Sequence, residues 1–273
     1  MNPYRLPPTP VCISFSGGRT SGYMLRQILD AHDGQLPPDA HVIFANTGKE
    51  RPETLDFVRE CGARWGVPVR WVEWQRDLPR WREVTYETAS RDGEPFSALI
   101  AWKSYLPNPV QRLCTQHLKI DAMKRFLKEA CGVAGEYTTA IGIRHDEPRR
   151  WRIIGQDSRN RREWKVAPLV TAKVTEDDVM AFWSRQSFDL SLSQGEGNCD
   201  LCFLKATATK ERIIRQRPDL AAWWANHENP AQGRRRLWRA TGASYGDLIE
   251  RQRRQLPLFP DLRESEPDCN CTD

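Results

Sequence analysis

Residues 11–25 constrain the fold of this chain more than any other stretch. An apolar run at residues 11–15 leads into the segment SGGRTS at residues 16–21, and apolar residues then recur at helical spacing up to Leu29. A buried strand, a glycine-rich turn and a helix in this order favour a phosphate site, because glycines let the backbone approach an anion and the first N–H groups of the helix point at it. A plain strand–helix turn with Ser21 as the N-cap is the alternative.

Comparison of the loop with known phosphate-binding motifs narrows the phosphate interpretation. Two familiar phosphate motifs, G-x-x-x-x-G-K-[ST] and G-x-G-x-x-G, are both absent from it. SGGRTS instead resembles the S-G-G-x-[DT]-S loop of the PP-loop ATP pyrophosphatases, which cleave ATP between its α and β phosphates. The resemblance implies a catalytic role for Arg19, whose positive charge would stabilise a pyrophosphate leaving group.

Composition narrows the class of protein. The chain has 273 residues, a formal net charge of +5 and eight cysteines. Its amino terminus has no apolar signal segment, and no run reaches the ~18 apolar residues that a membrane span needs. We therefore expect a cytoplasmic protein with no membrane partner. Basic clusters at residues 144–152, 159–162, 234–239 and 251–254 suit an anionic substrate or a nucleic acid, and they suit solvated helix faces equally well.

The next elements predict a parallel sheet. Strands are expected at residues 41–47 and 67–74, with a helix over 53–65 between them. Alternating strands and helices favour right-handed crossovers, and ligands bind such sheets at the carboxyl ends of the strands. The corner NTGKERPETLDFV at residues 46–58 resembles the "NTG.E.PET..F" block of the phosphoadenosine phosphosulfate (PAPS) reductase family. The resemblance places this corner against the nucleotide, with Asn46 and the backbone of Phe44 reading the adenine edge.

Further blocks of the same family occur in the same order. Residues 111–126, 142–150 and 164–170 resemble its "R.C...LK..P", "G.R..ES..R" and "PL" segments, although Pro148 replaces the serine and no proline follows the LK pair. Arg144 is expected at the nucleotide phosphates, and Arg149 or Arg150 at a second anion, because a guanidinium donates two parallel hydrogen bonds. The candidate nucleotide ligands are Ser14, Ser16, Gly17, Gly18, Arg19, Thr20, Ser21, Phe44, Asn46, Thr47, Gly48, Gly142 and Arg144.

The expected fold is an α/β three-layer sandwich with a mainly parallel sheet, of the adenine nucleotide alpha-hydrolase kind. It should occupy residues 1–205, followed by a helical extension over 206–273. Residues 75–110 read as an irregular insertion, either a lid beside the site or a packed surface excursion. A helix with Thr175 as its N-cap should follow residues 164–170, and further helices are expected at 210–217, 218–228 and 244–254.

The cysteines divide into two groups. Cys12, Cys61 and Cys131 lie among apolar or helical neighbours and suit buried positions. Cys199 and Cys202 form a C-x2-C pair, which is typical of metal or cluster ligands. Resemblance to reductases that carry a [4Fe–4S] cluster adds Cys114 as a third ligand, and Cys271, then Cys269, is our candidate for the fourth. A four-cysteine zinc site and free thiols are the alternatives. Cys114 precedes a helix, a position that favours a thiolate.

Three functions fit these features. The first is an enzyme that uses ATP and Mg²⁺ to adenylate an acceptor, with an iron–sulfur cluster assisting sulfur transfer to a nucleic acid. The second is a reductase of PAPS or a related adenylyl sulfate, with Cys269 or Cys271 replacing the catalytic cysteine of the missing "ECG.H" motif. The third is a zinc-stabilised, nucleotide-sensing protein that binds nucleic acid. The expected partners are an adenine nucleotide, a nucleic-acid acceptor or a sulfur-donor protein, and a second copy of the chain in a homodimer.

Overall fold

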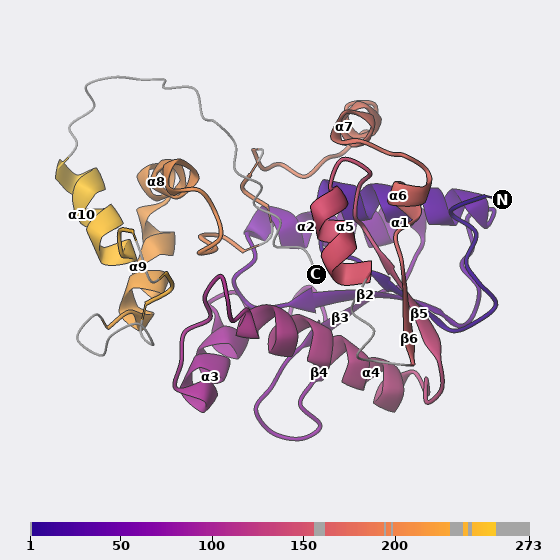
Figure 1. Ribbon diagram of the computed structural model, residues 1–273, viewed down its shortest axis with the longest axis horizontal. Helices are drawn as coiled ribbons and strands as arrows, with labels where there is room; N and C mark the ends of the chain where they lie inside the picture. The colour runs from indigo at the N-terminus through magenta and orange to yellow at the C-terminus, as the bar shows by residue number, and fades with distance from the viewer. Residues whose placement is uncertain are drawn as a thin grey trace.

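The computed structural model describes residues 2–155, 162–193, 195–197, 199–229, 237–239 and 242–254. Within these ranges the centre is a six-stranded sheet in the order β4-β3-β2-β1-β5-β6 (Figure 1). All neighbouring pairs are parallel except β3 and β4. The strands are β1 (Val11–Ser14), β2 (Ala40–Asn46), β3 (Val69–Glu73), β4 (Arg82–Val84), β5 (Tyr137–Ile141) and β6 (Glu163–Val166). The predicted mainly parallel α/β fold is confirmed.

Helices cover both faces of the sheet (Figure 1). One layer holds α1 (Arg19–Ala31), α2 (Pro52–Trp65) and α7 (Glu176–Trp183), and the other holds α3 (Glu94–Lys103), the π-helix η1 (Cys114–Asp121) and α4 (Ala122–Ala130). The remaining helices are α5 (Pro148–Gly155), α6 (Pro168–Thr171), α8 (Thr207–Gln216), α9 (Pro218–His227) and α10 (Tyr245–Arg254). Among the described residues, no helix combines the length and apolar character required to cross a membrane.

The alternation of β1 separates two hydrophobic cores. Val11 and Ile13 face the core beneath α1 and α2, whereas Cys12 faces the core that also contains residues of α3, η1 and α4. Each of these three β1 residues is at most 2% exposed. Successive side chains of a strand point to opposite faces, so β1 must be apolar on both. The continuous apolar run in the sequence has this origin.

Local signals set several helix ends. Pro52 occupies the first turn of α2, where its missing N–H costs little, and the helix ends at Gly66 in the left-handed conformation, φ 62°. Thr175 caps α7 through a capping box with Asp178, as the sequence predicts. These two helices therefore begin and end where residue chemistry favours it.

Three segments differ from expectation. Residues 75–110 contain β4 and α3, and the burial of Phe96 and Leu99 supports the packed excursion rather than a lid. The predicted strand at residues 164–170 stops at Val166, because Pro168 has no N–H for a ladder and begins the short helix α6. Helix α5 follows the 142–147 loop and has no counterpart in the sequence-based expectation.

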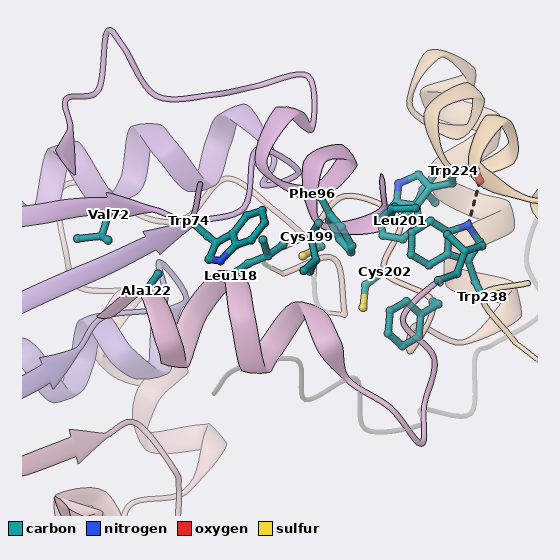
Figure 2. Packing of buried hydrophobic residues seen from close by; sticks show 14 of the residues in the cluster. Val72, Trp74, Phe96, Leu118, Ala122, Cys199, Leu201, Cys202, Trp224 and Trp238 are labelled. Atoms are coloured by element: carbon teal, nitrogen blue, oxygen red, sulfur yellow. Dashed lines mark hydrogen bonds between the residues drawn. The ribbon is translucent and has the colours of Figure 1, made fainter. Parts of the chain in front are cut away.

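An aromatic cluster joins the C-terminal helices to the main body. Trp224 and Trp238 pack with centroids 4.6 Å apart, and Phe96 of α3 lies edge-on to both at 5.9 and 5.7 Å. The indole N–H of Trp238 donates to the carbonyl of Trp224 at 2.9 Å (Figure 2). Cys199 and Cys202 lie in the same core, between Leu118 of η1 and Trp238 (Figure 2).

Candidate functional site

The SGGRTS loop has a backbone that only glycine allows. Gly17 has φ 77°, and a Cβ there would lie 2.7 Å from Thr54 Cγ2 and 2.9 Å from Val58 Cγ2. Gly18 is extended and caps α1 without a side-chain hydrogen bond, and the first turn of α1 has no acidic residue. The hydroxyls of Ser16 and Ser21 lie 3.0 Å apart. Ser21 Oγ also donates to the carbonyl of Gly18 at 3.0 Å. The loop can therefore present backbone N–H donors to an anion at the positive end of the helix.

Arg144 reaches the same loop from the neighbouring strand. Because β5 pairs with β1, the segment after β5 lies beside the start of α1. Gly142 makes this approach fit, since a Cβ there would be 3.0 Å from Ser21 Cα. Arg144 Nη1 then donates to Thr20 Oγ1 at 3.3 Å. The structure thus brings together Thr20, Ser21, Gly142 and Arg144, all of which the sequence assigned to the nucleotide.

Acidic neighbours fix the Arg144 guanidinium. Its Nε donates to Asp146 at 2.9 Å and its Nη2 to Glu176 at 3.1 Å. Burial works against the charge, but Glu147, Asp146 and Glu176 outweigh burial and raise the pKa of Arg144. The side chain is therefore a fixed cation at the carboxyl edge of β1 and β5.

Arg19 points elsewhere. Its Nε and Nη2 form a two-pronged contact with Asp189 at 2.8 and 2.7 Å, and its Nη1 donates to the carbonyl of Leu192 at 3.1 Å. Its Nη2 also contacts the carbonyl of Leu190. Arg19 therefore holds the segment after α7 against the start of α1. No local pattern in the sequence pointed to Asp189, because 170 positions separate the two residues.

The corner after β2 is rigid and buried. Asn46 is 0% exposed, donates to Glu73 Oε1 at 2.6 Å and to the carbonyl of Ser90 at 2.9 Å, and accepts from the N–H of Gly48 at 3.1 Å. Thr47 is bound to Glu50. The side chain of Asn46 therefore shapes the corner, and its amide is already engaged within the protein.

Phe44 also lies inside the protein. Its side chain is 1% exposed and packs edge-on against Trp71, with centroids 4.8 Å apart. Its aromatic ring belongs to the core beneath α2, along with Val58. Any contact with a ligand would have to come from its backbone, as the sequence-based hypothesis states.

A cavity of about 1000 Å³ opens beside the loop. It lies between η1 and α4 on one side, α5 on the other, and the face of β1, β5 and β6. Its charged lining residues are Arg112, Lys124, Arg144, Asp146, Glu147, Arg149, Arg150, Glu163, Lys165 and Glu176. Polar residues at alternate positions of β5 and β6, such as Thr139, Glu163 and Lys165, were the available sequence signal for this cavity.

Three of the predicted cysteine ligands share one core. Cys199 and Cys202 are 8% and 4% exposed. Cys114, the first residue of η1, packs against the same hydrophobic cluster. Cys199 Sγ lies 3.9 Å from Thr47 Oγ1. In the described ranges, no group of three His, Cys, Asp or Glu side chains is arranged to hold a metal ion. Cys269 and Cys271 lie outside the described residues, so the fourth ligand stays a prediction.

Burial controls the Cys114 thiol. Burial and the nearby Cys202 together raise its pKa to about 11, although Lys119 and Arg112 work in the opposite direction. Burial therefore opposes the thiolate that a position at the start of a helix favours. Three thiols from two distant segments in one apolar core nevertheless suit the donor set of a cluster or a zinc ion.

A buried ion pair connects the cysteine loop to the corner after β2. Lys49 Nζ lies 2.8 Å from Asp200 Oδ2, with side chains 6% and 3% exposed. The N–H of Asp200 donates to the carbonyl of Lys49 at 2.7 Å, and Glu50 forms a β-bridge with Cys199. The indole of Trp224 also donates to Asp200 at 2.7 Å. The C-x2-C loop is thus attached directly to the candidate nucleotide edge.

A known protein family matches most of this chain. The family model of the phosphoadenosine phosphosulfate reductase domain matches residues 10–191, so the C-x2-C loop lies beyond the match. The uncharacterized nin region protein ORF290 of Escherichia phage lambda is 32% identical over 207 residues, which cover 71% of this chain and 66% of that protein. The chain therefore spans just under two thirds of that relative's length.

Two solved structures show weaker similarity. The PAPS reductase of Candida auris, in a phosphate complex, has 17% identity over 67% of this chain and 79% of that chain, with a TM-score of 0.42. The U34-tRNA thiolase NcsA of Methanococcus maripaludis, with its [4Fe–4S] cluster, has 15% identity over 97% and 78%, also with a TM-score of 0.42. At this level neither structure bears on activity. The family match covers most of the candidate nucleotide edge described above, and this chain belongs to the phosphoadenosine phosphosulfate reductase domain family.

Proposed function

We propose that this protein is an enzyme that binds ATP at the SGGRTS loop and adenylates an acceptor, in the service of sulfur transfer to a nucleic acid. The observation that carries the proposal is the meeting of Arg144 with the loop, where Nη1 lies 3.3 Å from Thr20 Oγ1. A fixed guanidinium beside a glycine loop and a helix start is a combination that suits a polyphosphate. Mg²⁺ accompanies ATP in this proposal.

The two arginines take different roles. Arg144 contacts the phosphates, because it already touches the loop and lines the cavity. Arg19 retains the proposed part of stabilising the leaving pyrophosphate, and it also anchors residues 189–192 through Asp189. The side chain of Arg19 is 18% exposed and that of Asp189 is 39% exposed, so the ion pair between them is partly screened by solvent.

The proposed chemistry has two steps. An acceptor oxygen attacks the α-phosphorus of ATP, the bond to the α–β bridging oxygen breaks, and pyrophosphate leaves. A sulfide equivalent from a donor protein then displaces AMP, which carries the acceptor oxygen away. Donors around the loop stabilise the charge that develops on the leaving phosphates.

Cys114, Cys199, Cys202 and Cys271 would hold a [4Fe–4S] cluster in this proposal, with Cys269 as the alternative fourth ligand. A bound cluster would supply an iron site able to carry a sulfur atom. The attachment of the C-x2-C loop to the corner after β2, through Lys49 and Asp200, supports a cluster close to the nucleotide edge.

Calorimetry with ATP tests the nucleotide site. Arg144→Gln should weaken binding roughly 10–100-fold, since a hydrogen bond to a charged group contributes about 1.5–3 kcal/mol. Arg26→Gln is the matched control, because Arg26 lies on α1 but pairs only with the exposed Asp30 in the described contacts. Equal affinity of the wild type and Arg144→Gln would remove the loop edge as the ATP site.

Product analysis separates the alternative functions. Anaerobically purified protein should release pyrophosphate from ATP in the presence of an RNA or DNA acceptor. Sulfite release from PAPS, without pyrophosphate release from ATP, would favour the reductase. About four iron atoms per chain, lost in Cys199→Ser, would support the cluster, whereas about one zinc per chain would support the zinc-stabilised binding protein.

A further inference from the structure

The cavity extends well beyond the phosphate corner. Ser14 and Arg144 lie at the carboxyl edge, but Tyr137 and Thr139 line the cavity further down β5. Four residue steps separate Tyr137 from Ile141, which is about 13 Å along a strand. At about 1000 Å³ the cavity is also at the upper limit of about 300–1,000 Å³ for small-ligand sites. It therefore has room for a ligand besides the nucleotide phosphates.

One part of the cavity, here called the slot, has apolar side chains of α4 and α5 in its lining. Met123 of α4 lines one side, and Ile153 and Ile154 of α5 line the other. Ile153 is 66% exposed, although it is a large apolar side chain in the lining of the cavity. Two apolar sides above a sheet floor suit a flat, ring-shaped group.

A buried carboxylate lies at the edge of this slot. Glu163 has a side chain 7% exposed; it accepts from Thr139 Oγ1 at 2.8 Å and pairs with Lys124 Nζ at 2.8 Å. A carboxylate has about four lone-pair positions, so these two contacts leave further acceptor capacity toward the cavity. An amino or ring N–H group of a heterocycle is a suitable donor for it.

Two arginines add positive charge to the lining of the cavity, near its mouth. Arg112 Nε is buried, and within the described part of the chain nothing accepts its hydrogen bond. Arg149 lines the same mouth with an exposed side chain. A buried guanidinium N–H without an acceptor is costly, and a phosphate oxygen would supply that acceptor.

We propose that this cavity binds a second nucleotide, whose base enters the slot between α4 and α5 and whose phosphate meets Arg112 and Arg149. The inference rests on the proposed function, because it identifies this nucleotide as the acceptor that ATP activates. The base would meet Glu163 about one strand length from Arg144, so the two ligands occupy opposite ends of one cavity. Placing a single base in such a slot takes it out of any stack.

The test uses a variant that places a bulky side chain in the slot and leaves the SGGRTS loop unchanged. Met123→Trp places an indole inside the cavity, and Met180→Trp on the exposed face of α7 is the matched control, since Met180 is 44% exposed. The probes are ATP, the four common ribonucleoside monophosphates, and fluorescent single-stranded RNA and DNA 12-mers. Circular dichroism and thermal melting confirm that each variant is folded.

We expect Met123→Trp to weaken binding of a monophosphate or a 12-mer at least tenfold and to leave ATP affinity within twofold. Glu163→Gln should change the order of preference among the bases. Binding of the monophosphates alone would identify a free nucleotide as the ligand, whereas binding of the 12-mers alone would identify a nucleotide unit within a strand. Either result supports the site.

Two results would overturn the second site. If Met123→Trp abolishes ATP binding, the slot holds the adenine of ATP and there is no second ligand. If no monophosphate or 12-mer binds the wild type, or all bind Met123→Trp as well as the wild type, the cavity is not a nucleotide site. Failure of the proposed function has a different signature, because Arg144→Gln would then leave ATP affinity unchanged.

Discussion

Removing Lys49 should destabilise the cysteine loop far more than a typical surface substitution. Its ammonium and the Asp200 carboxylate lie 2.8 Å apart, and both side chains are almost completely buried. In Lys49→Met the carboxylate stays in the protein interior, and the hydrogen bonds it accepts from the described residues come from neutral donors, the indole of Trp224 and the N–H of Leu201. Removing one member of a buried pair costs about 3–5 kcal/mol, because it leaves an uncompensated charge.

The two remaining donors place Lys49→Met toward the lower limit of this range. In Asp200→Asn the ammonium keeps its position 4.9 Å from the centroid of the Trp223 ring. Such a contact contributes about 0.5–2 kcal/mol, so this variant should lose slightly less. The double variant Lys49→Met/Asp200→Asn should lose much less than the sum, since neither buried charge is then left alone.

Urea denaturation is the appropriate assay, because urea adds no ionic strength. Hydrogen exchange of the amides in residues 199–205 would localise the effect. Their exchange rates should rise by roughly 100-fold in Lys49→Met if local opening costs about 3 kcal/mol less. Arg26→Met, which breaks the exposed pair with Asp30, is the control and should lose under about 0.5 kcal/mol. A loss below 1 kcal/mol for Lys49→Met, or strict additivity in the double variant, would refute the reasoning.

Three shorter predictions concern other parts of the molecule. Gly17→Ala should lower thermal stability by about 1–3 kcal/mol and weaken ATP binding, because φ 77° and the contact with Thr54 exclude a Cβ; a wild-type melting curve would contradict this. Burial raises the pKa of Glu228 to about 6 from its ordinary 4.5, so its contribution to stability is complete below pH 4.5 and is lost as the pH rises through 6; Glu228→Gln should flatten the stability profile over that interval, and an unchanged profile would be evidence against this origin. Both Arg19→Gln and Asp189→Asn should lower the melting temperature, and Arg19→Gln should lower it more because it also loses the contacts with the carbonyls of Leu190 and Leu192. Only Arg19→Gln should weaken ATP binding in calorimetry, and equal ATP affinity in both variants would assign Arg19 a structural role alone.

The sequence identified the part of the site that depends on neighbours along the chain. The strand, the SGGRTS turn and α1 follow one another within residues 11–31, and each is favoured by local chemistry. The capping box at Thr175 and the left-handed Gly66 are also local, and both were readable for that reason. Alternating elements further indicated a parallel sheet and its ligand-binding edge.

Contacts between distant segments could not be read in this way. The orientation of Arg19 depends on Asp189, and the burial of Asn46 depends on Glu73 and Ser90. The pKa of Cys114 depends on how tightly η1 packs near Cys202, which no local pattern reports. Each of these residues has a chemistry evident from its type, but its partner comes from a fold-dependent contact.

The sequence by itself determined the class of fold and indicated the candidate phosphate loop and the candidate anion and metal ligands, because propensity, periodicity and turn chemistry act over a few residues. The tertiary structure decided which of those residues meet. Pairing of β5 with β1 brings Arg144 to Thr20, and the Lys49–Asp200 pair brings the C-x2-C loop to the corner after β2. These contacts arise from packing and from the need to pair buried charges, which only the folded chain can satisfy.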